Sequence, residues 1–176
     1  NHSLFDWLNG NSDPASRDLF RMKKWFKQMV SAVNYIHSKN LTDICYSPVT
    51  FFSPRKILSS LLGIATERRY DVESNPEIVG TSTGTTLYMS PEQRLWFRYS
   101  TRSDVFSLSL IFAELCIVMT ASDRSQIFDA FRRGDQHDLS NQIKDEKTVD
   151  FIKLLTQVEP RNRPSSREMI DHILLA

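Results

Sequence analysis

The chain has 176 residues, of which 40% are hydrophobic and 24% charged, and its formal net charge is +1. These values are typical of one globular domain with a real core, and they give no reason to expect a nucleic acid or an anionic membrane as partner. Cys45 and Cys116 are too few for a disulfide scaffold or a cysteine zinc site. We therefore predict a cytoplasmic protein. The first residue is Asn1 rather than Met, so we expect a fragment and leave an upstream membrane anchor open.

The first 40 residues predict two helices. The apolar side chains of residues 4–8 form one side of a short helix that Asn9-Gly10-Asn11 ends. Asp13-Pro14 predicts the start of a longer helix, which runs to about Ser38, because Asp is a good N-cap and Pro suits the first turn. Its apolar residues recur every three or four positions and predict one buried face: Leu19, Met22, Trp25, Phe26, Met29, Val30, Val33 and Ile36.

The next segment predicts loops and short strands. Pro48 and Pro54 exclude a continuous helix between residues 41 and 67. Thr50-Phe51-Phe52 and Lys56-Ile57-Leu58 predict the two strands of a short hairpin. The polar stretch 68–83 predicts a mobile loop.

The last 75 residues predict further helices. Residues 105–119 are apolar at almost every position, which is typical of a helix buried on all sides. A shorter helix, Ser125–Arg133, ends at Gly134. The pattern in Glu146–Gln157 predicts another helix with an apolar face at Val149, Ile152, Leu154 and Leu155. Ser165-x-x-Glu168 is a capping box that opens the last helix, which is predicted to face inward with Met169, Ile170, Ile173 and Leu174.

One stretch, residues 84–93, carries a family resemblance. Ser90-Pro91-Glu92 resembles the Ala-Pro-Glu motif that closes the activation segment of protein kinases. Gly84-Thr85 is similar to the kinase loop that receives the residue next to the phosphoacceptor. Asp104 stands where kinases carry the Asp of their central buried helix. The form Gly-Thr-x-Leu-Tyr-Met-Ser-Pro-Glu-Gln most resembles kinases that phosphorylate the alpha subunit of translation initiation factor 2.

The resemblance extends over nearly the whole chain, from Ser3 to Leu175. The segments 3–10, 35–41 and 161–164 are similar to the same initiation-factor kinases. The implied fold is mainly α: a protein-kinase-like C-terminal lobe with a short β-hairpin region, in which the N-lobe is absent. The chain carries no Gly-rich phosphate loop, no Val-Ala-Ile-Lys lysine and no helix glutamate to pair with it. We therefore expect residues 1–176 to form a single, incomplete kinase domain.

The residues that perform phosphate transfer in the family are replaced. A kinase needs a catalytic-loop Asp, a Lys two residues later, an Asn that holds magnesium, and the Asp of Asp-Phe-Gly. Aligned on Phe51-Phe52 and Gly63, these four places hold Ile44, Tyr46, Val49 and Leu61. Hydrocarbon groups cannot coordinate a hard cation, so we expect no catalytic residue, no metal site, and no binding of ATP and magnesium by this chain alone. A register shift would make Asp43 a displaced base, but a turn residue is the simpler interpretation.

The resemblance also implies structural roles. Glu92 and Arg163 stand where kinases form a buried ion pair. Asp104 is expected to cap the buried helix and to hold the 41–49 loop, and His37 to be a structural cap rather than a ligand. Thr85, Ser90 and Pro91 belong to the activation segment. The helix Ser125–Gly134 corresponds to the substrate-docking helix of initiation-factor kinases. Its possible docking residues are Phe128, Phe131, Arg132 and Arg133, although apolar groups of this kind more often pack on the lobe.

These expectations favour a catalytically inactive kinase-like module, a pseudokinase with a binding or regulatory role in translation or stress signalling. Its partner would be a protein, either the initiation factor 2 alpha subunit or a kinase. The alternative is a residually active serine/threonine kinase whose N-lobe lies upstream. A third interpretation is a relic lobe that folds poorly because its interlobe surface is uncovered.

Overall fold

The computed structural model describes residues 4–14, 17–42, 66–67, 86–96, 100–135 and 139–172. The helices are α1 (Leu4–Gly10), α2 (Leu19–Ser38), α4 (Pro91–Trp96), α5 (Thr101–Cys116), α6 (Ala121–Arg133), α7 (Glu146–Leu155) and α8 (Ser166–Ile170). Two 3-10 turns, η2 (Thr86–Tyr88) and η3 (Pro160–Asn162), accompany them. The strands β1 (Leu41–Thr42) and β2 (Thr66–Glu67) pair antiparallel, with Leu41 opposite Glu67. The fold is mainly α, as predicted.

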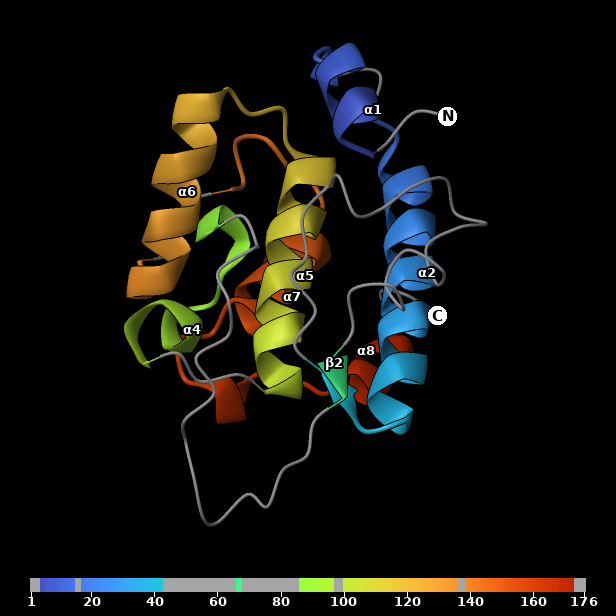
Figure 1. The fold of residues 1–176 in the computed structure, drawn as a ribbon. Coiled ribbons are helices and arrows are strands. Elements are labelled where there is room, and N and C mark those ends of the chain that lie inside the picture. Colours follow the sequence, from blue (N-terminus) through green and yellow to red (C-terminus); the bar gives the residue numbers. More distant parts are fainter. Residues whose placement is uncertain are drawn as a thin grey trace.

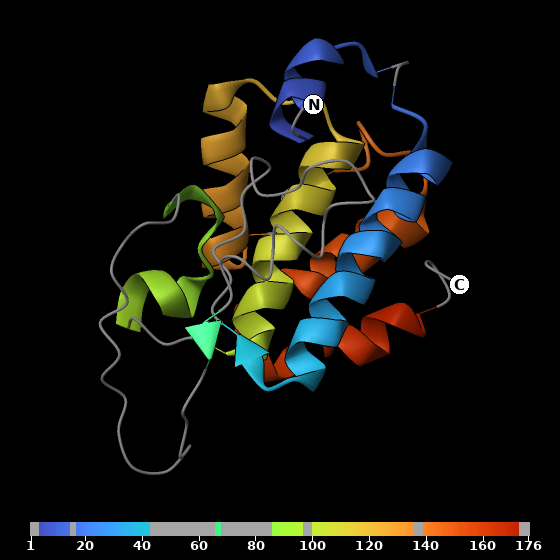
Figure 2. The same ribbon diagram turned by 45° about the vertical axis from the view of Figure 1, so that its right-hand side comes forward.

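Helix α5 is the centre of the lobe. It lies between α2 on one side and α6 on the other, in both views of the ribbon (Figures 1 and 2). Every residue from Ser103 to Leu115 is buried, as the nearly continuous apolar pattern predicts. The helix ends at Cys116, a little earlier than predicted, and Ser100 caps its first turn by accepting from the Ser103 N–H.

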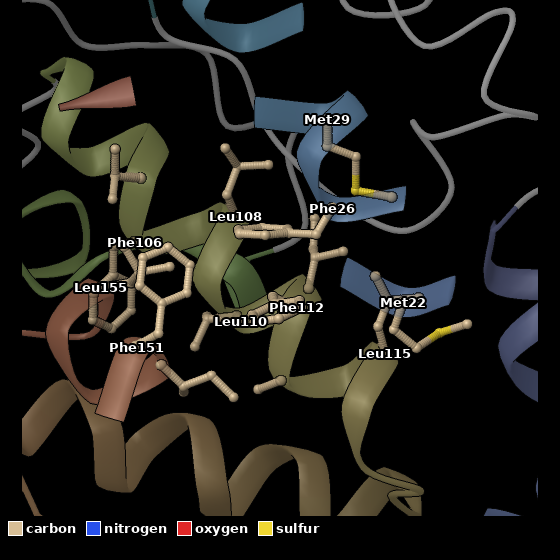
Figure 3. Close-up of a cluster of buried hydrophobic side chains, with 14 of the residues drawn as sticks. Met22, Phe26, Met29, Phe106, Leu108, Leu110, Phe112, Leu115, Phe151 and Leu155 are labelled. Carbon is tan, nitrogen blue, oxygen red and sulfur yellow. The ribbon is translucent and has the colours of Figure 1, made fainter. Parts of the chain in front are cut away.

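Aromatic packing joins α5 to its neighbours. The Phe26 ring of α2 stacks on Phe112 of α5 with centroids 4.2 Å apart. Phe151 of α7 meets both rings edge-on, at 6.4 and 6.3 Å. Figure 3 shows these rings together with Met22 and Met29 of α2 in one continuous core. Aromatic pairs of this geometry contribute about 0.5–1.5 kcal/mol each beyond their area burial, so α2, α5 and α7 are packed as one unit.

Three predicted details were wrong. The long helix begins at Leu19 and not at Asp13-Pro14, because Asp18 supplies the N-cap and accepts from the N–H groups of Phe20 and Arg21. Helix α6 begins at Ala121 rather than Ser125, because Thr120 and Asp123 form a capping box there. In α7, Leu154 is 38% exposed, and Phe151 takes the place in the core that we assigned to it.

Of the remaining predictions, one is confirmed and several concern residues outside the described ranges. The Ser165–Glu168 capping box is confirmed, and Met169 is fully buried. Ile173 and Leu174 lie outside the described residues, as do the predicted strands 50–52 and 56–58 and the predicted loop 68–83. The β1–β2 pair was not predicted, because strands of two residues carry no periodic pattern. Within the described ranges, no helix combines the length and the apolar character needed to cross a bilayer.

Candidate functional site

The predicted ion pair between Glu92 and Arg163 is present and closes the end of the activation-segment region. Arg163 donates from Nη1 to Glu92 Oε1 at 2.7 Å and from Nη2 to Oε2 at 2.9 Å. The Ser103 hydroxyl donates to the same Oε1 at 2.7 Å. Both partners are buried, so the two charges are held by a bidentate arrangement rather than by solvent.

The remaining donors of Arg163 are also used. Its Nε donates to the Gln157 carbonyl at 2.6 Å, and its two terminal nitrogens reach the carbonyls of Val158 and Arg102 at 2.8 and 3.0 Å. Burial opposes ionisation of Glu92, but the hydrogen bonds and charge of Arg163 prevail and lower the pKa of the carboxyl. Arg163 therefore joins three separate segments through one planar group.

The predicted activation-segment residues that the structure describes have a structural position. Ser90 and Pro91 are buried at the start of α4. The Ser90 N–H donates to Gln93 Oε1 at 2.8 Å, and the Gln93 N–H returns to Ser90 Oγ at 3.4 Å. Ser90 thus acts as the cap of α4. Thr85 lies outside the described residues.

A buried polar cluster that the sequence did not reveal lies next to this segment. The Tyr88 hydroxyl donates to Glu114 Oε2 at 2.7 Å, and Arg124 Nε lies 2.6 Å from Glu114 Oε1, at angles unlike those of a hydrogen bond. Burial raises the pKa of Glu114 and outweighs the opposing effects of Tyr88, Arg124 and Arg17. Burial, together with the Glu114 charge, also raises the pKa of Tyr88. A single Glu within a helix predicted to be buried on all sides is the signal that could have marked Glu114, but its partners lie elsewhere in the chain.

Asp104 is buried, but it is not the cap of α5. Ser100 fills that role, which corrects the predicted one. Asp104 Oδ2 instead accepts from His37 Nε2 at 2.8 Å. The other ring nitrogen, Nδ1, lies 2.9 Å from the Ser166 hydroxyl. His37 is thus a structural residue that links the end of α2 to α5 and α8. Of the loop that Asp104 was predicted to hold, residues 43–49 lie outside the described ranges.

Most of the predicted docking residues of α6 face the lobe. Phe128 is fully buried and its ring packs edge-on against Tyr88, with centroids 5.4 Å apart, while Phe131 is 4% exposed. Arg132 donates to the carbonyls of Met89, at 2.8 Å, and of Leu87. Burial lowers the pKa of Arg132 to about 10. These three side chains position the 87–89 segment from the inside.

The exposed side of α6 carries the remaining predicted residue. Arg133 is exposed and pairs with Asp135 at 2.8 Å. Asp129 bridges Arg132 at 2.9 Å and Arg94 of α4 at 2.7 Å. A partner that binds α6 could therefore contact Arg133 and its exposed neighbours. Phe128, Phe131 and Arg132 are buried and could not be reached in this arrangement.

The positions at which we predicted replaced catalytic residues are not among the described residues. Ile44, Tyr46, Val49 and Leu61, and also Asp43, fall in the ranges that the structure leaves out. In the part of the chain that is described, no group of three or more His, Cys, Asp and Glu side chains could hold a metal ion. Two open cavities among the described residues, of about 340 and 590 Å³, lie at the ends of α7 and of α5.

Comparison with known proteins agrees with this architecture. Residues 1–175 match the protein kinase domain family. The chain is 34% identical over 98% of its length to the translation initiation factor 2-alpha kinase pek-1 of Caenorhabditis elegans. It is 33% identical over 96% of its length to the interferon-induced, double-stranded RNA-activated protein kinase of Mus musculus.

The match to the initiation factor 2-alpha kinase 3 of Bos taurus is weaker, at 28% identity over 96% of the chain. The chain spans only 17%, 32% and 15% of these three relatives. The family assignment is supported by the matched family, by the shared identity and by the buried Glu92–Arg163 pair. The chain belongs to the protein kinase domain family and is related to the kinases of initiation factor 2 alpha.

Proposed function

We propose that this chain is a kinase-like module that binds a protein partner and does not transfer phosphate. The observation that carries the proposal is the set of residues at the four places where phosphate transfer is performed: Ile44, Tyr46, Val49 and Leu61. Three of these side chains are hydrocarbon and can neither coordinate magnesium nor accept a proton. Tyr46 has a hydroxyl but no positive charge at neutral pH.

The retained framework supports a folded binding role rather than a relic. Glu92, Arg163, His37 and Asp104 all make buried polar contacts that join separate helices. Buried charges are costly unless they are paired, so they fit a lobe that still folds. On this proposal residues 1–176 act as one C-lobe-like unit of a single, incomplete kinase domain.

The proposed partner is the alpha subunit of initiation factor 2, with a kinase as the second candidate. Two of the relatives are named as kinases of this factor, which motivates the choice. Calorimetric titration of the alpha subunit against the chain tests it. Arg133→Glu should weaken binding, whereas Arg167→Glu, the reversal of another exposed and paired arginine on α8, should not. Absence of binding, or equal loss in both variants, would count against this partner.

The alternative is residual kinase activity that uses Asp43 as a displaced base, with the N-lobe supplied upstream. A phosphorylation assay separates the two. The complete protein is incubated with radiolabelled ATP, magnesium and the alpha subunit, with a magnesium-chelated sample as control. We expect no magnesium-dependent incorporation. Incorporation that requires magnesium and disappears in Asp43→Ala would overturn the inactive-module proposal. The titration above would still report independently on partner binding.

A further inference from the structure

The outward side of α2 combines exposed aromatic rings with basic residues. Phe20 is 76% exposed and Tyr35 is 48% exposed, the two highest values among aromatic side chains of the described core helices. Lys24 is exposed between them, and Lys27 is half-buried. The helix sequence contains no Asp or Glu at any of its positions. This side of the lobe therefore differs from an ordinary solvated face, which mixes both signs of charge and few rings.

The spacing places these residues in one line. At 3.6 residues per turn, positions 20, 24, 27, 31 and 35 fall on the side of α2 opposite the buried residues 22, 26, 29, 33 and 36. We call Phe20, Lys24, Lys27, Ser31 and Tyr35 the basic stripe. It is about 22 Å long, at 1.5 Å per residue. Lys39 extends the basic charge to its end, since its ammonium lies 5.5 Å from the Tyr35 ring centroid.

The charges of the stripe are not neutralised within the described part of the chain. Lys23, on the flank of α2, pairs with Asp145 at 2.6 Å. Among the described residues, however, no carboxylate lies within ion-pair distance of Lys24 or Lys27, nor of Arg21, whose guanidinium lies 4.6 Å from the Trp25 ring centroid. By contrast, Arg94, Arg132 and Arg133 around α6 all have carboxylate partners.

We propose that the basic stripe binds an acidic, amphipathic segment of a partner protein. Carboxylates of that segment would pair with Lys24 and Lys27, while its apolar side chains would cover Phe20 and Tyr35. Aromatic side chains are enriched at protein interfaces, and unpaired lysines attract carboxylates across them through charge complementarity. A nucleic acid fits less well, because the chain has a net charge of only +1 and the basic stripe is one short helix face rather than a broad basic surface.

The stripe is distinct from the proposed docking side of α6. The two helices lie on opposite sides of α5 in both ribbon views (Figures 1 and 2). Charge reversal on α2 should therefore leave binding through Arg133 unchanged, and failure of one proposal does not imply failure of the other.

Fluorescence anisotropy with a labelled acidic peptide tests the inference. The probe is an amphipathic peptide about 16 residues long, which matches the stripe, with its scrambled sequence and an oligonucleotide of equal length as competitors. Lys24→Glu/Lys27→Glu should weaken peptide binding about tenfold or more, since each reversal replaces an attraction by a repulsion. The matched control is Lys153→Glu/Arg161→Glu, which changes the net charge equally at a half-buried and an exposed site near α7. It should change the affinity less than about twofold.

Two further measurements sharpen the result. Phe20→Ser should weaken binding while leaving its dependence on salt unchanged, because salt screens the lysine contacts and not the ring contact. Melting temperatures of all variants should match the wild type, since the replaced side chains are outside the core. If both double variants lost the same peptide affinity, the effect would come from the net charge of the chain rather than from the stripe, which would overturn the proposal. No binding of the peptide, or tighter binding of the oligonucleotide, would overturn it too.

Discussion

Glu92 and Glu114 are both buried next to an arginine, yet the pKa values of their carboxyl groups are shifted in opposite directions. Glu92 is 5% exposed and Glu114 is 1% exposed. The pKa of Glu92 is lowered, although burial alone would raise it, because the hydrogen bonds and charge of Arg163 prevail. The pKa of Glu114 is raised, because burial prevails there over Tyr88, Arg124 and Arg17. Burial alone therefore does not decide the direction in which the pKa of these residues shifts.

The difference lies in how each carboxylate is held. Glu92 receives two parallel N–H donors from one guanidinium and a hydroxyl from Ser103. Glu114 receives a single tyrosine hydroxyl, and its arginine approaches without hydrogen-bond geometry. At Glu92, bidentate, charge-assisted bonds offset the desolvation of the carboxylate. At Glu114, one neutral donor, the misaligned Arg124 and the charge of Arg17 do not.

Removal of Arg163 should give the largest effect. Arg163→Ala leaves Glu92 as an uncompensated buried charge and removes donors to three carbonyl groups, so we expect a loss of about 3–5 kcal/mol in unfolding free energy. Urea denaturation followed by circular dichroism measures it. Arg167→Ala, whose ion pair is exposed, is the matched control and should change stability by less than about 0.5 kcal/mol. Similar losses in the two variants would show that the buried pair of Arg163 and Glu92 stabilises the fold no more than an exposed ion pair does.

The two glutamates should also differ in their dependence on pH. Because the folded-state pKa of Glu92 is lowered, its stabilising contribution is present above its ordinary value of 4.5 and is lost as the pH falls through the folded-state value. Because the folded-state pKa of Glu114 is raised, its contribution is complete below 4.5 and is lost as the pH rises through the folded-state value.

Glu92→Gln and Glu114→Gln test this difference. The deficit of Glu92→Gln relative to the wild type should shrink as the pH is lowered below 4.5. The stability of Glu114→Gln relative to the wild type should instead increase as the pH is raised above 4.5, because glutamine cannot ionise in the buried site. At neutral pH we expect Glu92→Gln to be the less stable variant by about 2 kcal/mol or more. Parallel pH profiles of unfolding free energy would contradict the comparison.

A smaller effect is expected at Tyr88. Tyr88→Phe removes the hydroxyl that donates to Glu114 while keeping the ring packed on Phe128. We expect a loss of about 1–3 kcal/mol at neutral pH, with the larger part recovered at acid pH where Glu114 is protonated. Thermal melting at two pH values measures it. A loss that does not depend on pH would mean that the hydroxyl does not act on the charge of Glu114.

The smallest effect is expected for an ion pair of the same chemistry at the surface. Arg94 and Asp129 are 2.7 Å apart, but their side chains are 44% and 42% exposed. Arg94→Ala should cost less than about 1 kcal/mol, and the cost should fall further at high salt, because solvent already stabilises both charges. A loss comparable to that of Arg163→Ala would show that exposure does not separate the two pairs.

Local features of the fold could be predicted from the sequence, and its long-range polar contacts only in part. The capping box of Ser165 and Glu168 and the burial of α5 on all sides follow from spacings within a few turns of helix. The Glu92–Arg163 pair was predicted only through the family resemblance, since its members are 71 residues apart. The start of α2 was misplaced because Asp13 and Asp18 are both good caps, and only the packed structure selects the second.

The sequence by itself determined the helical periodicity, the buried central helix and the family, because each is a matter of which residue stands at which spacing. The tertiary structure decided which polar groups meet. His37 and Asp104 are 67 residues apart, and Arg132 and Met89 are 43 apart. The chemistry of a side chain determines which hydrogen bonds it can donate or accept. Which partner lies within hydrogen-bonding distance depends on how the helices pack, because that contact exists only once the apolar faces of α2, α5 and α6 have been buried together.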